Sequence, residues 1–293
     1  MRAGEERQLH RLEKIVAAAA LAAVLALAVG FAQAREPRAE PDRLALRASA
    51  ALVQDATSGE TLYAKNDSAV VPIASLTKLM TALVIVESGV DLAQRVVISE
   101  EDFDTLKGTR SRLAAGSVFT REELLLLALM ASENRAAAAL ARTFPGGSAA
   151  FVAQMNARAR LLGMADTRFV DASGLSPANV SSAHDLARLA AAAYAHPIIR
   201  EYSTRERAVV QVFGRPQEFR NTNALVRSGQ WDIGLSKTGY IAEAGRCLVM
   251  RVRMASRDLV VVLLDSWGKH ARAADAARIR RWLETSAARA PRG

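Results

Sequence analysis

Cysteine and histidine are scarce in this chain, which has one cysteine, Cys247, and four histidines among its 293 residues. A single cysteine cannot form a disulfide within the chain, even in an oxidising compartment. We expect Cys247 to fill the core, because a thiol nucleophile needs a nearby base and an electropositive pocket that the sequence does not indicate. The histidines include no pair at metal-ligand spacing, so the sequence supports neither a zinc site nor another cofactor.

Long hydrophobic runs are absent after the N-terminal segment. Residues 15–31 form an apolar run that follows a basic stretch and precedes Ala32-Gln33-Ala34. This order is typical of a secretory signal, so we predict a signal peptide over residues 1–34 with cleavage after Ala34. Retention as an uncleaved anchor is the alternative, because the run is slightly long for a signal and slightly short for a membrane span. Either way the remainder is exported, to the periplasm, with no later segment to span the membrane.

Acidic residues are fewer than basic ones, and the formal net charge is +9, or +8 after residue 34. A basic exported protein is attracted to polyanions such as cell-wall polymers and anionic lipids. The excess of basic residues can also be explained by the Arg- and Ala-rich composition of the chain alone, without a polyanionic partner. The export signal argues against nucleic acid as a partner.

The remaining chain has the composition of one large domain or two closely packed lobes. Hydrophobic residues make up 51% of it, and glycine and proline are scattered, so it can bury a full core. Residues 35–47 lack apolar periodicity and are expected to form an exposed lead. The domain is expected over residues 48–288, followed by a tail over residues 289–293.

Hydrophobic periodicity predicts strands at both ends of the domain and helices between them. The predicted strands are 50–55 and 61–64, joined by a hairpin, and later 235–239, 247–254 and 259–264. The predicted helices are 75–87, 124–130, 134–143, 149–162, 183–195 and 271–288, and Thr120 with Glu123 forms a capping box before the second of them. This order predicts an α+β fold: a five-stranded antiparallel sheet flanked by helices, with an all-α insertion over about residues 88–220.

A serine and a lysine lie one turn apart where the chain enters the first helix. In Ser75-Leu76-Thr77-Lys78 the two side chains share a helix face, which brings an amine within reach of a hydroxyl that it can deprotonate. The helix N-terminus adds positive potential where an oxyanion would develop. Such a pair is common by chance, so it needs further support.

Two more polar motifs supply that support. Ser132-Glu133-Asn134 interrupts two apolar helices, so its side chains must be hydrogen-bonded or exposed in a cleft. Lys237-Thr238-Gly239 ends a strand, where lysine supplies charge, threonine a hydroxyl for a carboxylate, and glycine close approach of a ligand backbone. Each motif alone has an ordinary structural explanation: the first could be a helix–helix turn, and the second a strand with a surface lysine.

Together and in this order, the three motifs resemble those of penicillin-binding proteins and serine β-lactamases. The chain is more narrowly similar to the low-molecular-mass DD-peptidases, and among them to the periplasmic D-alanyl-D-alanine endopeptidases of the penicillin-binding protein 7 type. The resemblance covers about residues 45–288 and implies a β-lactamase/transpeptidase-like fold. It is carried by the three motifs and by residues 107–112, 130–140, 174–181, 221–223, 237–245 and 265–269.

The resemblance implies roles for residues of these motifs. Ser75 is expected to attack the D-Ala carbonyl, with Lys78 as general base and with Ser132 and Lys237 passing a proton to the leaving amine. Further expected roles are that Asn134 holds the acyl side chain, Thr238 of the Lys237–Gly239 motif meets the leaving residue's carboxylate, and the backbone N–H groups of Ser75 and Tyr240 form the oxyanion hole. Two nearby ammonium groups should depress the pKa of one lysine, which a lysine base requires.

The expected substrates are peptidoglycan peptides, with β-lactams as covalent inhibitors. A D-alanyl-D-alanine carboxypeptidase remains the alternative to the endopeptidase, although carboxypeptidase relatives often add a C-terminal β-rich domain and a membrane-binding helix. A class A β-lactamase is disfavoured, because no glutamate lies between Asn134 and Glu201 to serve deacylation. A non-catalytic wall-binding protein is disfavoured because all three motifs are intact.

Overall fold

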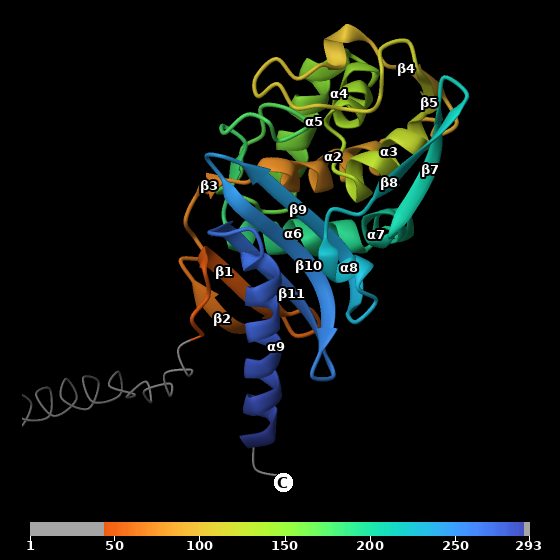
Figure 1. The fold of residues 1–293 in the computed structure, drawn as a ribbon. Coiled ribbons are helices and arrows are strands. Elements are labelled where there is room, and N and C mark those ends of the chain that lie inside the picture. Colours follow the sequence, from red (N-terminus) through yellow and green to blue (C-terminus); the bar gives the residue numbers. More distant parts are fainter. Residues whose placement is uncertain (1–43, 290–293) are drawn as a thin grey trace, which may run out of the picture. The chain divides into compact units, whose positions relative to one another are not determined.

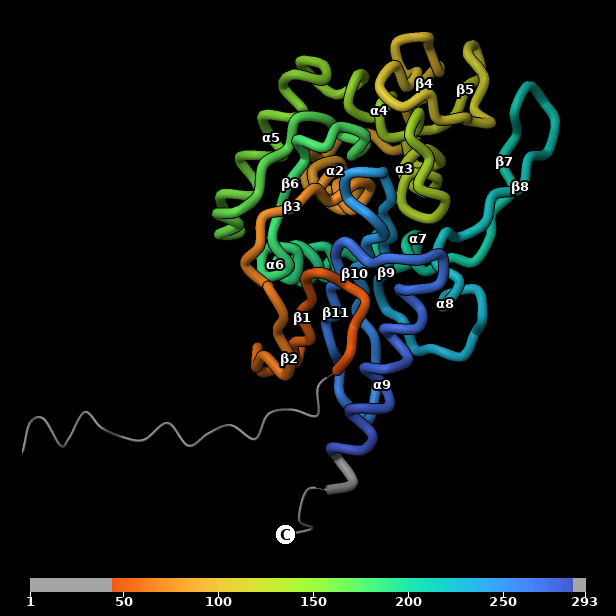
Figure 2. The backbone as a smooth tube through the Cα atoms, turned by 60° about the vertical axis from the view of Figure 1, so that its left-hand side comes forward, coloured from red at the N-terminus to blue at the C-terminus, as the bar shows by residue number. Residues whose placement is uncertain are grey.

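The computed structural model describes residues 44–289, in which the two ends of the domain build one antiparallel sheet (Figure 1). Its strand order is β2-β1-β11-β10-β9. The first two strands of the chain are β1 (Ala48–Asp55) and β2 (Thr61–Lys65); the last three are β9 (Asp232–Ile241), β10 (Gly245–Met254) and β11 (Arg257–Ser266). Strand β1 pairs with β11, so that Ala48 lies opposite Ser266, and Figure 2 shows these distant segments side by side. The predicted five-stranded sheet is confirmed.

Helices cover both faces of this sheet. Helix α6 (Ala183–Tyr194) packs against four of the strands, and α9 (Ala271–Arg289) packs against β1, β10 and β11. In Figure 1, α9 lies in front of the sheet and α6 behind it. The central strands are therefore continuous apolar runs, as at residues 259–264, all of which are buried.

Helix α2 (Thr77–Glu87) lies at the centre of the helical region, and residues 77–85 are buried on every side. It packs against α3 (Arg121–Met130), α4 (Asn134–Arg142), α5 (Gly147–Leu161) and α6. The predicted capping box begins α3: Thr120 Oγ1 accepts from the Glu123 N–H, and the Glu123 carboxylate accepts from the Thr120 N–H. Two shorter helices, α7 (Pro197–Thr204) and α8 (Ala224–Arg227), precede β9.

The insertion expected over about residues 88–220 is not all-α. It contains two two-stranded sheets, β4 (Arg95–Val97) with β5 (Val118–Thr120) and β7 (Arg207–Val212) with β8 (Arg215–Arg220). It also contains β6 (Val180–Ser181), which pairs with β3 (Val71–Pro72) from before the insertion. The β7–β8 hairpin turns at Phe213-Gly214, both with positive φ, as the two-residue turns that suit strand twist require. These strands are short and mostly half-exposed, so their apolar pattern is weak.

Some predictions concern chain ends outside the described residues. The signal peptide over residues 1–34, most of the lead over 35–47 and residues 290–293 of the tail lie there. Within the described part, Leu46 is already buried, and α9 continues through Arg289. No helix among residues 44–289 is both long enough and apolar enough to cross a bilayer.

Candidate active site

Ser75 lies on a single 3-10 turn, η1 (Ala74–Leu76), that leads directly into α2. Ala74 has a positive φ of 48°, an unfavourable conformation for a residue with a Cβ. Its carbonyl oxygen accepts a hydrogen bond from Thr77 Oγ1 at 2.8 Å, which holds the turn. Lys78 follows in the first turn of α2, and its Nζ lies 3.0 Å from Ser75 Oγ, as the three-residue spacing predicts.

The Lys78 side chain is fully buried, with 0% exposure, and its Nζ has three oxygen neighbours. Besides Ser75 Oγ these are Asn134 Oδ1 at 2.7 Å and the Ser173 carbonyl oxygen at 2.6 Å. Burial lowers the pKa of Lys78 to about 7, although the negative charges of Asp171 and Glu133 oppose this shift. A large fraction of Lys78 is therefore neutral near pH 7.

The two other neighbours of Lys78 orient its lone pair. A neutral amine has two N–H donors and one lone pair, while a carbonyl oxygen only accepts. In the ammonium form Lys78 donates to all three oxygens; in the neutral form the Asn134 and Ser173 oxygens can take both N–H groups, which leaves the lone pair for the Ser75 hydroxyl 3.0 Å away. Thr109 fixes the orientation of the Asn134 amide, because its Oγ1 accepts from Asn134 Nδ2 at 3.0 Å.

A second buried lysine lies across from the first. Lys237 on β9 is 1% exposed, and its Nζ donates to Ser132 Oγ at 2.8 Å and to the Thr238 carbonyl at 2.9 Å. Ser132, between α3 and α4, has a φ of 58°. Burial, followed by repulsion from Lys78 and Arg272, holds the pKa of Lys237 well below its usual range. Both lysines are thus poised to exchange protons with hydroxyl groups.

The edge strand β9 approaches the Ser75 turn closely at Gly239. A Cβ at Gly239 would lie 2.9 Å from the Ile73 carbonyl oxygen and 3.2 Å from the Ser75 nitrogen, so this contact requires glycine. Beside it, Thr238 Oγ1 lies 2.6 Å from Thr222 Oγ1. Tyr240 follows, with 57% of its surface exposed. The structure thus brings together the eight residues singled out from the sequence: Ser75, Lys78, Ser132, Asn134, Lys237, Thr238, Gly239 and Tyr240.

The loop that carries Ser173 was not assigned a role from the sequence. Asp171 organises it: its carboxylate accepts from the N–H and Oγ of Ser173, at 2.7 and 2.8 Å, and from the Gly174 N–H at 2.6 Å. The Ser176 N–H and Asn179 Nδ2 donate to its other oxygen. Residues 174–181 were noted as part of the resemblance, which was the only signal for this loop.

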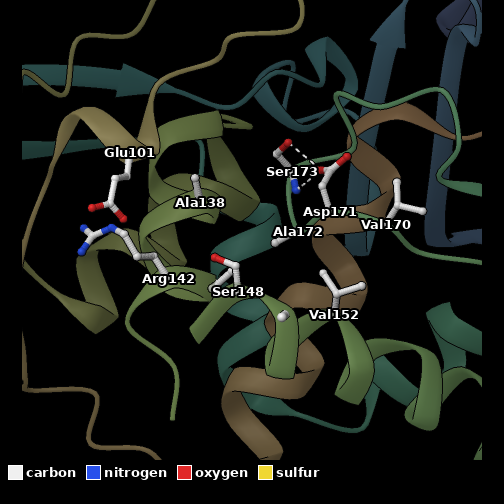
Figure 3. A pocket seen from close by; sticks show the side chains of 11 residues that line it. Glu101, Ala138, Arg142, Ser148, Val152, Val170, Asp171, Ala172 and Ser173 are labelled. Atoms are coloured by element: carbon white, nitrogen blue, oxygen red, sulfur yellow. Dashed lines mark hydrogen bonds between the residues drawn. The ribbon is translucent and has the colours of Figure 1, made fainter. Parts of the chain in front are cut away.

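The same loop lines a cavity of about 520 Å³ on the side of α4 and α5 (Figure 3). Glu101 and Arg142 lie at one end of this cavity, and Asp171 and Ser173 at the other. None of the eight predicted site residues lines it. The loop is therefore packed against the Ser75 turn on one side, where Ala172 and Ser173 are buried, and borders open space on the other.

Two cationic residues complete the surroundings. Arg272, on α9, donates from Nη1 to the Gly239 carbonyl at 3.2 Å and to the Cys247 carbonyl at 3.0 Å. Lys107 forms an ion pair with Glu243, which joins the loop of Thr109 to the β9–β10 turn. Neither contact was predicted, because each depends on residues more than twenty positions apart.

Cys247 is buried in the sheet, as predicted, and its Sγ lies 3.3 Å from the Ala244 carbonyl oxygen. Burial raises the pKa of its thiol to about 11, so it is not an activated nucleophile. Within residues 44–289, no three His, Cys, Asp or Glu side chains gather in a way that could hold a metal ion.

The chain is similar to known proteins in sequence and in fold. Residues 35–268 match the family model described as D-alanyl-D-alanine carboxypeptidase. A D-alanyl-D-alanine endopeptidase of Pseudomonas aeruginosa is 45% identical over 265 residues, covering 89% of this chain and 85% of that protein. One of Escherichia coli is 42% identical over 243 residues, covering 82% and 78%. The crystal structure of a Streptomyces DD-transpeptidase matches with a TM-score of 0.75 at 26% identity, over 82% of this chain and 98% of that one.

Proposed function

The chain belongs to the D-alanyl-D-alanine carboxypeptidase family, and we propose that within this family it is a periplasmic endopeptidase that cleaves D-alanyl cross-links in peptidoglycan. It is a serine-type D-Ala-D-Ala peptidase and has the fold of the DD-peptidases and DD-transpeptidases. The observation that carries the proposed mechanism is the hydrogen bonding of Lys78, whose two fixed acceptors leave its lone pair for Ser75.

In the proposed acylation step, Ser75 Oγ attacks the D-alanyl carbonyl carbon while Lys78 Nζ takes the hydroxyl proton. A C–O bond forms, and negative charge moves to the carbonyl oxygen. The backbone N–H groups of Ser75 and Tyr240 are assigned to stabilise this oxyanion. Support comes from the close contact of Gly239, which precedes Tyr240, with the Ser75 turn: a Cβ at Gly239 would lie 3.2 Å from the Ser75 nitrogen.

In the proposed departure step, the C–N bond breaks and the leaving nitrogen takes a proton from Ser132 Oγ. Lys237 Nζ, 2.8 Å away, replaces that proton, which its lowered pKa favours. Thr238 binds the carboxylate of the leaving residue, and Asn134 holds the acyl side chain once substrate is bound. Water then hydrolyses the ester and regenerates the Ser75 hydroxyl. A β-lactam would form the same ester and remain attached to Ser75.

Endopeptidase activity is favoured over carboxypeptidase activity by the relatives. Those at 45% and 42% identity, which align over most of both chains, are endopeptidases. The family description supports release of terminal D-Ala as the alternative. The predicted export signal supports a periplasmic location.

The test is digestion of purified cross-linked muropeptide dimers and of free pentapeptide by residues 35–293, with products resolved by mass. Conversion of dimers to monomers is expected, with no conversion by Ser75→Ala. Release of D-Ala from pentapeptide without cleavage of dimers would make the protein a carboxypeptidase. Cleavage of neither substrate would contradict both assignments. Peptide mapping after penicillin treatment should place the adduct on Ser75.

A further inference from the structure

A row of positive charges extends from the buried Lys237 to the protein surface. Arg272 contacts the Gly239 carbonyl beside Lys237, and its charge lowers the Lys237 pKa. Arg246 in turn lowers the pKa of Arg272, second to the effect of burial. Each of these three cationic side chains therefore lies close enough to the next to repel it, along the β9–β10 edge of the sheet.

No carboxylate among the described residues pairs with Arg246 or Arg272. The acidic side chains of neighbouring segments have other partners. Glu243 pairs with Lys107, Asp265 accepts from Ser49 Oγ at 2.8 Å, and Asp275 accepts from Arg278 at 2.7 Å. A row of like charges without counter-charges is costly in the protein and attracts an anion.

Strand geometry places Arg246 on the side where the leaving group is expected. In the register of the sheet, Arg246 on β10 lies directly opposite Tyr240 on β9, and its Cζ is 4.7 Å from the centroid of the Tyr240 ring. Side chains two positions apart in a strand share a face, so Thr238 and Tyr240 lie on the same one. The Tyr240–Arg246 pair is therefore about 7 Å along the strand from the assigned carboxylate contact, Thr238.

Stacking on Tyr240 preorganises the Arg246 side chain for binding an anion, whereas an unstacked surface arginine moves freely. Tyr240 is exposed while Arg246 is half-buried beside it. A guanidinium held over an aromatic ring keeps its N–H edge available for a carboxylate, and loses less conformational freedom on binding.

We propose that Arg246, stacked on Tyr240, is a specificity residue that binds a second carboxylate on the leaving peptide of a cross-linked substrate. This inference rests on the proposed endopeptidase function. Both substrates present one carboxylate next to the scissile bond, which Thr238 would meet. A terminal D-Ala leaving group carries no second carboxylate. The leaving peptide of a cross-linked substrate is longer and has a further carboxylate at its own C-terminus. Arg246 thus contributes to cleavage of cross-links and not to trimming.

The test compares kcat/KM of wild type, Arg246→Ala and Arg246→Lys on three substrates. The first is a cross-linked dimer, and the third is free pentapeptide. The second is the same dimer in which every carboxylate of the leaving peptide is amidated, except the one next to the scissile bond. Arg246→Ala should lower kcat/KM about 3- to 10-fold on the dimer and less than about twofold on the other two. Arg246→Lys should recover part of the loss, since it keeps the charge without the planar donor edge.

Arg253→Ala is the matched control, because Arg253 is an exposed arginine on the same strand with only a distant ion partner, Asp232 at 3.7 Å. It should leave all three values unchanged. The rate of acylation by penicillin, which lacks the leaving peptide, verifies that each variant is folded and active. An equal loss on all three substrates, or no loss on the dimer, would overturn the inference. If the wild type itself failed to cleave dimers, that result would contradict the proposed endopeptidase function, on which the role of Arg246 rests.

Discussion

At the level of single residues, the proposed role of Lys78 as general base depends on burial, which lowers its pKa to about 7 while hydrogen bonds hold its position. Lys78 is fully buried, and its two acceptor neighbours, Asn134 Oδ1 and the Ser173 carbonyl oxygen, are uncharged. Its nearest carboxylates act at longer range and only partly oppose the effect of burial. The balance places its pKa close to the pH of the surroundings, where a general base is most effective.

This balance predicts the pH dependence of acylation. The pKa of Lys78 is lowered to about 7, and only the neutral form can accept the Ser75 proton. The second-order rate of penicillin acylation should therefore rise through pH 7 and, well below it, fall about tenfold per pH unit. Asn134→Asp would place a negative charge beside Lys78 Nζ and favour the ammonium form. The pH at which the acylation rate rises should therefore increase by about 1–3 pH units. Stopped-flow measurement from pH 5 to 9 checks both, and a flat wild-type profile would contradict the assignment of Lys78 as base.

At the level of elements, the active-site turn is held between a strand and a loop that each contribute a glycine. Gly239 of β9 meets the turn from one side, and Gly174 meets it from the other. Gly174 has a φ of +79°, and a Cβ there would lie 2.0 Å from the Ala74 carbonyl oxygen. Its N–H is fixed by Asp171, which also holds Ser173 against Lys78. This loop thus contacts both the turn that carries Ser75 and the side chain of Lys78, its proposed base.

Gly174→Ala should therefore damage activity more than the loss of glycine flexibility explains. Gly59→Ala is the matched control, because Gly59 has a similar φ of +75° but nothing within 4 Å of its Cβ position. The control should cost about 1–2 kcal/mol of unfolding free energy and leave acylation unchanged. Gly174→Ala must also shift the Ala74 backbone, so it should lower the acylation rate at least tenfold as well as the Tm. Equal effects of the two variants on acylation would show that the contact with Ala74 is unimportant.

At the level of the whole molecule, the first strand and the last helix of the domain are joined at a buried carboxylate. Asp275 of α9 accepts from the Arg47 and Ala48 backbone N–H groups, at 3.1 and 2.9 Å, and is fully buried. Nearby, Trp282 of α9 packs edge-on against Tyr63 of β2, with ring centroids 6.1 Å apart. These contacts hold together the two ends of the chain that build the sheet.

Removing this carboxylate should destabilise the domain without altering its chemistry. Asp275→Ala leaves two backbone N–H groups without their acceptor, at a cost of about 2–5 kcal/mol, and should lower the Tm by about 5–15 °C. Glu284→Ala, on the same helix, removes an exposed ion pair with Arg280 and should change stability by less than about 1 kcal/mol. Thermal unfolding followed by circular dichroism measures both. A Tm for Asp275→Ala within 2 °C of the control would contradict this role.

Most helices and the sheet strands could be located from the sequence, because their signals are local. Apolar spacing and the capping box at Thr120 depend on neighbours within four positions, and so does the pairing of Ser75 with Lys78. The short strand pairs, such as β7–β8, were missed because their half-exposed residues carry little periodicity. The three polar motifs and the resemblance then indicated which segments meet.

The tertiary structure alone decided the hydrogen-bond partners, burial and pKa values of the side chains in those motifs. The acceptor of Lys78 at Ser173 lies 95 positions away along the chain, and Arg272 reaches Gly239 from a different element. The stacking of Arg246 on Tyr240 depends on the register of β9 with β10. A sequence specifies residue types and local spacing, and these led to the proposed nucleophile, Ser75, and the proposed base, Lys78. Burial, which lowers the pKa of Lys78, and the gathering of the Lys237, Arg272 and Arg246 charges are properties of the packed chain, since desolvation and Coulomb forces act through space.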